Sequence, residues 1–193
     1  DFLRLVWPGT SRRPGAGDLT VELSSLSRLA VQHARNHAAE ALYLHAGADL
    51  TRPISFYGLI NERCNVKCRY CEFWRLENYQ KEMTIEQWQD ALLSIRDFVG
   101  RYSISFSGGE PFMKKGFIDL LAWCREQGIE AGVTTNGSAF SRKIVARTVA
   151  ARPLNVNVSC DGPDAVTHDY LRGWPGLFET LSNGIVHLRA EQR

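Results

Sequence analysis

Three of the five cysteines in this 193-residue chain, Cys64, Cys68 and Cys71, lie within eight residues of one another. Thiolates are soft ligands that select zinc or iron–sulfur clusters. A structural zinc site normally has four ligands and a closed coordination shell, and no further cysteine or histidine follows here at zinc-finger spacing. Three thiolates on one loop suit a [4Fe–4S] cluster better, because such a cluster leaves one iron open for chemistry.

The remaining cysteines and the nearest histidine pair have simpler interpretations. Cys124 falls on one face of a predicted helix and Cys160 at the end of a predicted strand, so we expect both to be small buried apolar side chains. His33 and His37, with Glu40 nearby, lie one helical turn apart. They can form a helical metal pair, but without a third ligand the pair is more typical of an ordinary helix face.

Three further polar segments each follow a predicted strand. They are Gly108-Gly109-Glu110-Pro111, then Thr135-Asn136-Gly137, and finally Ser159-Cys160-Asp161-Gly162 with His168 and Arg172 beyond it. Barrel enzymes build their active sites at the carboxyl ends of strands. Each segment also has a structural interpretation, because Gly, Pro and Asn-Gly are common in turns and an exposed arginine often contributes nothing measurable.

The elements that must position these segments alternate between strand and helix after Pro53. Strands are predicted at residues 54–60, 103–107, 130–135 and 155–160, and helices at 84–99, 116–127, from Ser141 toward Pro153, and at 177–191. Thr84 and Gln87 match a capping box at the start of the first of these helices. This alternation implies right-handed crossovers and therefore a parallel sheet or barrel.

Two of the predicted strands have one polar face. The second places Ser103, Ser105 and Ser107 on the same side, and the fourth does so with Asn155 and Asn157. A parallel sheet covered by helices on both faces is apolar on both. The polar faces therefore favour an open barrel with a ligand-holding interior.

The N-terminal part has a different character. Residues up to about 20 have turn and linker composition, and residues 24–45 show apolar side chains at helical spacing before Gly47. We predict two domains: an N-terminal extension with an amphipathic helix at residues 1–50, and a core at residues 51–193.

Composition excludes several classes of partner. The formal net charge is +2, with 23 Lys and Arg against 21 Asp and Glu, which is too small for a nucleic-acid-binding surface. No apolar run reaches the roughly 18 residues that a membrane-spanning helix needs. We expect a cytoplasmic protein with no membrane span and no nucleic-acid partner.

Taken together, the motifs resemble those of the radical S-adenosylmethionine (SAM) enzymes. The pattern CxxxCxxC has Tyr70 before its last cysteine, and the GGEP, Thr-Asn-Gly and Asp-Gly segments follow it in the family's order over about residues 54–190. The resemblance implies an α/β fold, a partial (β/α) TIM-type barrel of the radical SAM kind with four β/α units visible. The family core commonly has six such units, so we expect this chain to be a truncated core that is inactive alone.

The resemblance also implies two cofactors and a reaction. Cys64, Cys68 and Cys71 would bind three irons of a [4Fe–4S] cluster, and SAM would chelate the fourth. Reductive cleavage of SAM would then release a 5'-deoxyadenosyl radical, which abstracts a hydrogen atom from the substrate. The protein would bind and orient the cofactors and exclude competing reactions, because the cofactors carry the difficult chemistry.

Seven residues match family positions that contact SAM. The family pattern places the Tyr70 backbone at the adenine, Gly108, Gly109 and Glu110 at the amino group, Asn136 and Ser159 at the ribose or carboxylate, and Arg172 at the carboxylate.

The motif style looks most like the branch of peptide-modifying enzymes that carry a SPASM or twitch domain. It implies an electron donor such as flavodoxin or ferredoxin and favours a peptide substrate. Two alternatives stay open: a non-catalytic scaffold that binds cluster and SAM, and a radical SAM enzyme of small-molecule cofactor biosynthesis.

Overall fold

A computed structural model describes residues 16–76 and 82–191 of the chain. The chain divides into two compact units, of which one is Pro8–Ile54 and the other contains Ser55–Arg193. The described residues of the first unit contain one long helix, α1 (Ala16–Ala46). The sequence pattern predicted that this helix begins at Ser24, but it begins eight residues earlier, at Ala16. The linker predicted at the N-terminus lies largely outside the described residues.

The second unit is built on a four-stranded parallel sheet with the strand order β1-β2-β3-β4. The strands are β1 (Ser55–Asn61), β2 (Ser103–Gly108), β3 (Glu130–Thr135) and β4 (Val156–Val158). This confirms the predicted α/β fold with sequential parallel strands. The fourth strand is shorter than predicted, although the amide of Ser159 still donates to the carbonyl of Thr135 at 2.9 Å.

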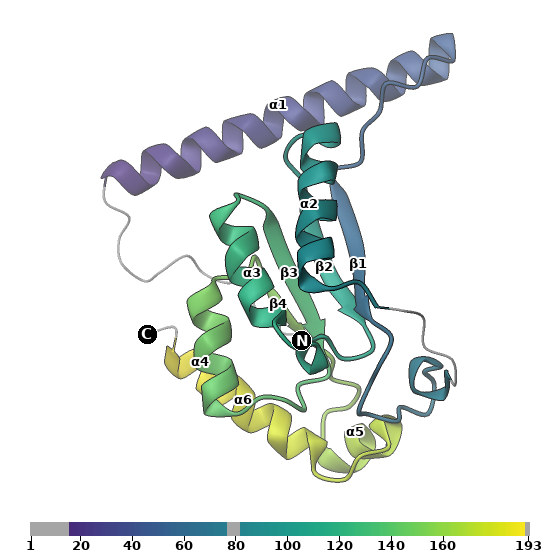
Figure 1. Ribbon diagram of the computed structural model, residues 1–193, viewed down its shortest axis with the longest axis vertical. Coiled ribbons are helices and arrows are strands. Elements are labelled where there is room, and N and C mark those ends of the chain that lie inside the picture. Colours follow the sequence, from purple (N-terminus) through teal and green to yellow (C-terminus); the bar gives the residue numbers. More distant parts are fainter. Residues whose placement is uncertain (1–15, 77–81, 192–193) are drawn as a thin grey trace. The chain divides into compact units, whose positions relative to one another are not determined.

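Helices connect the strands and follow the last one (Figure 1). They are α2 (Ile85–Val99), α3 (Phe117–Glu126), α4 (Arg142–Ala151), α5 (Ala165–Arg172) and α6 (Leu177–Glu191), with short 3-10 turns η1 (Phe73–Arg75) and η2 (Pro111–Met113). The capping box of Thr84 and Gln87 is present, and Ser141 caps α4 as predicted. The helix α5, whose N-cap is Asp164, was not predicted from the sequence pattern. No described helix meets the length and apolarity that a membrane crossing requires.

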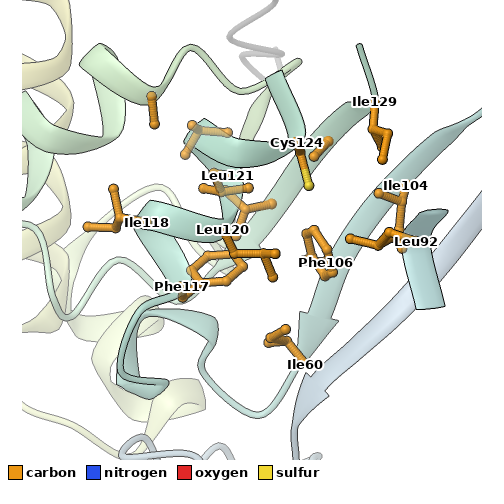
Figure 2. Packing of buried hydrophobic residues seen from close by; sticks show 14 of the residues in the cluster. Ile60, Leu92, Ile104, Phe106, Phe117, Ile118, Leu120, Leu121, Cys124 and Ile129 are labelled. Atoms are coloured by element: carbon orange, nitrogen blue, oxygen red, sulfur yellow. The ribbon is translucent and has the colours of Figure 1, made fainter. Parts of the chain in front are cut away.

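The hydrophobic core lies between the sheet and the helices. Phe106 of β2 is fully buried, and its ring meets those of Trp88 and Phe117 edge-on at 5.5 and 5.6 Å. Figure 2 shows Phe106 close to Leu92 of α2 and Leu120 of α3. The helices α2 and α3 cover the face of the sheet that carries Phe106 (Figure 1). Since alternate residues of a strand point to the same face, the residues of β2 on this side are apolar and buried.

The other face of the sheet is polar and open. Ser105 pairs with Tyr57 of β1 and with Gly132 of β3, which places these three residues in one row. Tyr57 is 83% exposed and Leu59 is 58% exposed. In the described part of the chain, this face of the sheet therefore carries exposed side chains and is not covered like the opposite face, as the alternating serines of β2 predicted.

Replacing Phe106 with alanine tests this core. Removing a fully buried ring leaves a cavity between β2, α2 and α3, so we expect F106A to lower the free energy of unfolding by about 3–5 kcal/mol. Urea denaturation followed by circular dichroism measures the change. Val166→Ala, at a position 83% exposed on α5, is the matched control and should change stability little.

Candidate active site

The three clustered cysteines lie in the loop that leaves β1. Cys68 is buried, and Cys64 and Cys71 are half-buried. All three pack in one small cluster with Val66 and Leu177, where Leu177 is the first residue of α6. The loop is therefore a folded structure with its own apolar support rather than an extended tether.

The three thiols have the donor chemistry that an iron–sulfur cluster requires. A [4Fe–4S] cluster takes one thiolate on each iron that the protein binds, so three thiols on one folded loop would hold three of its irons. Within residues 16–76 and 82–191, no three His, Cys, Asp or Glu side chains are grouped so as to hold one metal ion.

Two of the sulfurs face hydrogen-bond donors from distant parts of the chain. Nη1 of Arg172 lies 3.5 Å from Sγ of Cys68, and Nδ2 of Asn136 lies 3.7 Å from Sγ of Cys64. Burial raises the pKa of both thiols, and the guanidinium of Arg172 opposes that rise at Cys68. The polar groups thus favour the thiolate form that metal binding needs.

The Gly108-Gly109 turn after β2 crosses the beginning of the cysteine loop at very short range. The amide of Gly109 donates to the carbonyl of Asn61 at 3.0 Å, and the amide of Glu110 donates to that of Arg63 at 2.8 Å. A β-carbon on Gly109 would stand 2.0 Å from the carbonyl oxygen of Arg63. Glycine is required here because only its missing side chain permits this approach.

The carboxylate of Glu110 lies inside the structure, with no exposed surface. One oxygen accepts from the Phe112 amide at 3.1 Å and the Thr135 hydroxyl at 2.8 Å, while the other accepts from the Asn136 amide at 2.8 Å. Burial raises the pKa of Glu110, and these three hydrogen bonds oppose the rise. The side chain therefore ties the turn after β2 to the end of β3.

The side chain of Asn136 points toward the cysteine loop. Besides approaching the sulfur of Cys64, its Nδ2 donates to the side-chain oxygen Oδ1 of Asn65 at 3.2 Å. Its own Oδ1 accepts from the Ser138 amide at 2.8 Å. Asn65 also donates to the Ser138 hydroxyl at 2.9 Å. The end of β3 and the cysteine loop are thus joined by side chains, a contact that the sequence pattern did not predict.

The segment after β4 holds together a third part of the site. The side chain of His168 accepts a hydrogen bond from the Asp161 amide at 3.2 Å, and Asp169 accepts from the amides of Gly176 and Phe178, which begin α6. Arg172 pairs with the carboxylate of Asp161. The aspartate, histidine and arginine of this motif are therefore one connected structural unit.

The end of α5 braces the cysteine loop from its other side. The amide of Arg69 donates to the carbonyl of Leu171 at 2.9 Å, and its guanidinium stacks 4.0 Å from the ring of Tyr170. Gly173 has φ +65°, and a β-carbon there would meet the carbonyl of Lys67 at 2.4 Å. The loop is thus held between the turn after β2 and the end of α5.

The other predicted contacts lie at the same end of the sheet. Tyr70 is 59% exposed, and its hydroxyl donates to the carboxylate of Asp161. Ser159 lies just beyond β4, half-buried, beside the end of β3. The structure therefore gathers at this end all the residues that the sequence predicted to bind the cluster or SAM.

One minor expectation was wrong and another was confirmed. Cys160 is exposed, with its sulfur 3.3 Å from the carbonyl of Gly162, because β4 ends before it and leaves it in a loop. Cys124 is buried in the core as expected. On α1, His37 pairs with Glu40 at 3.6 Å on an exposed face.

Comparison with known proteins identifies the family. The sequence model of the Radical SAM superfamily matches residues 59–192. This region begins within β1 and contains the other three strands, the cysteine loop and the segments that contact the loop. The chain belongs to the radical SAM superfamily. Its members use a [4Fe–4S] cluster and SAM, in agreement with the cofactors expected from the motifs.

Two curated relatives illustrate the range of this superfamily. The chain is 32% identical over 131 residues to the AdoMet-dependent heme synthase of Nitratidesulfovibrio vulgaris, which covers 67% of this chain and 35% of the relative. It is 27% identical over 125 residues to the PqqA peptide cyclase of Rhodopseudomonas palustris, covering 64% of the chain and 33% of the relative. The chain thus spans about a third of the length of these relatives.

A solved structure supports the fold. Streptococcus suis SuiB bound to precursor peptide SuiA superposes with a TM-score of 0.62 and 22% identity, covering 83% of this chain and 35% of that one. The four-stranded sheet with its helices therefore has the fold of part of a radical SAM TIM-type barrel.

Gly109→Ala tests the close approach at the cysteine loop. The added methyl group meets the backbone of Arg63 and must push the loop away, so we expect an unfolding free energy lower by about 1–3 kcal/mol and less iron bound per chain after anaerobic reconstitution. Gly128→Asn is the control, since that site is open at φ +70° and asparagine tolerates this conformation. Equal iron content in both variants would contradict the prediction.

Glu110→Gln tests the buried carboxylate. The NH2 group of glutamine must face either the Asn136 amide or the donors of Phe112 and Thr135. In either orientation a donor faces another donor and a hydrogen bond is lost. We therefore expect the free energy of unfolding to fall by about 1–3 kcal/mol. Urea denaturation without SAM measures it. An unchanged stability, with only SAM affinity reduced, would mean that the carboxylate acts on the ligand and not on the turn.

Proposed function

We propose that this chain is the cofactor-binding part of an enzyme that cleaves SAM reductively and abstracts a hydrogen atom from its substrate. The observation that carries the proposal is the loop of Cys64, Cys68 and Cys71. The loop is fixed from two sides at the carboxyl end of a parallel sheet, next to the GGEP turn.

In this proposal the three cysteines hold the [4Fe–4S] cluster, which supplies the electron that cleaves SAM. Asn136 and Arg172 direct N–H groups at two of the sulfurs and so stabilise their anionic form. The apolar cluster around Val66 and Leu177 limits water at the loop. The electron comes from a donor such as flavodoxin or ferredoxin.

SAM is proposed to lie across the ends of the strands. The Tyr70 backbone would contact the adenine, the Gly108-Gly109 turn would receive the amino group, and Glu110 would place its negative charge behind that turn. Asn136 and Ser159 are assigned to the ribose or carboxylate. Arg172 pairs with Asp161 through one edge of its guanidinium, so an N–H group that Asp161 does not take is assigned to the SAM carboxylate.

A peptide is the substrate class we favour. The open face of the sheet carries Tyr57 and Leu59, both well exposed, beside the hydroxyls of Ser103, Ser105 and Ser107. A wide face with both apolar and hydrogen-bonding groups suits an extended chain. The similarity to a relative named PqqA peptide cyclase supports this choice.

The second candidate is a reaction of small-molecule cofactor biosynthesis. It is favoured by the AdoMet-dependent heme synthase, to which this chain is 32% identical over 131 residues. The two candidates share the cluster, SAM and the hydrogen abstraction. They differ only in what lies against the open face.

Anaerobic reconstitution of the full-length protein, followed by electron paramagnetic resonance (EPR) and a 5'-deoxyadenosine assay with flavodoxin as donor, tests the shared chemistry. We expect a [4Fe–4S] signal that changes when SAM is added, and SAM cleavage that is abolished by Cys64→Ala, Cys68→Ala or Cys71→Ala. Cys160→Ala removes an exposed thiol outside the loop and should leave both readouts unchanged.

Two outcomes would contradict the proposal in different ways. A protein that takes up zinc but forms no cluster would not be a SAM-cleaving enzyme at all. A protein that forms the cluster and binds SAM, yet releases no 5'-deoxyadenosine under reduction, would be the non-catalytic scaffold that the sequence left open.

A further inference from the structure

Arg172 approaches the cysteine loop as a buried cation. It stands at the last position of α5 and is 7% exposed, and its Nη1 lies 3.5 Å from the sulfur of Cys68. The other edge of the guanidinium faces Asp161, with Nη2 at 2.9 Å from Oδ1 and Nε at 2.7 Å from Oδ2. The fork is therefore held in a plane that directs one N–H at the sulfur.

The surrounding contacts leave Arg172 little freedom to move away. The amide of Asp161 is held by the side chain of His168, and the carboxylate of Asp161 also accepts from the hydroxyl of Tyr70. The residue before Arg172 accepts a hydrogen bond from the amide of Arg69, next to Cys68 in the loop. Both ends of the contact between guanidinium and sulfur are thus attached to the same framework.

We propose that Arg172 raises the reduction potential of the [4Fe–4S] cluster through its contact with the sulfur of Cys68, and that Asp161 holds it there. This inference rests on the proposed function, because it assumes that Cys68 binds the cluster. Hydrogen bonds to the sulfurs and nearby charge are among the factors that set cluster potentials. A donor with a positive charge stabilises the reduced cluster, which carries one more electron, over the oxidised one.

The role differs from the SAM-carboxylate contact assigned to Arg172 above, and the two can be separated. A carboxylate contact affects only the state with SAM bound. A contact with the sulfur acts on the cluster whether or not SAM is present. The deciding measurement is therefore the midpoint potential of the cluster without SAM.

The test is a redox titration of the reconstituted protein, without SAM, followed by EPR of the reduced cluster. For Arg172→Gln we expect the midpoint potential to become more negative by about 59 mV. This shift corresponds to about a tenfold change in the equilibrium constant of a one-electron reduction. Arg172→Lys keeps the positive charge but loses the fork, so its potential should fall between those of R172Q and the wild type.

Arg147→Gln is the matched control. Arg147 also forms an arginine–aspartate pair, with Nη2 at 2.7 Å from Asp119, but it joins the exposed surfaces of α4 and α3. Its replacement should leave the potential unchanged. Iron content and far-UV circular dichroism establish for each variant that the cluster and the fold are present.

The outcomes separate the inference from the function on which it rests. If the wild type forms a cluster and cleaves SAM, but R172Q and R172K keep the wild-type potential and lose only SAM affinity, Arg172 serves SAM alone and the inference is wrong. A shift in R172K larger than that in R172Q would also overturn it. If the wild type forms no cluster, the proposed function itself fails.

Discussion

The site depends on one close approach between two backbones. The Gly108-Gly109 turn lies so near residues 61–63 that no side chain fits between them, and two backbone hydrogen bonds connect the turn to the start of the cysteine loop. The loop must therefore leave β1 in a fixed direction. The motif glycines therefore decide where the thiols stand.

Buried polar groups extend this constraint across the sheet. Glu110 ties the turn after β2 to the end of β3, Asn136 ties β3 to the loop, and Asp161 with Arg172 ties the segment after β4 to Cys68. Buried charges are costly unless they are paired and hydrogen-bonded. Each of these polar groups has hydrogen-bond or ion-pair partners. These contacts connect the segments at the ends of the four strands to one another.

Most of the fold was predictable because its signals are local. Thr84 with Gln87, Ser141, and the alternation of Ser103 to Ser107 each report on a few neighbouring residues, and the structure has the predicted elements there. The misses have a physical cause as well. The helix α5 has only eight residues, too short for a clear apolar period, and β4 has only three residues, Val156–Val158.

Local patterns in the sequence indicate which residues could carry the chemistry: three thiols at cluster spacing, the order of the motifs and the parallel strands that bring them to one end. The contacts that each polar residue makes follow from the tertiary packing. Glu110 accepts three hydrogen bonds inside the protein, and Arg172 meets Cys68 across 104 residues of chain. Such contacts depend on how distant segments pack, and no local pattern of residue types records that packing.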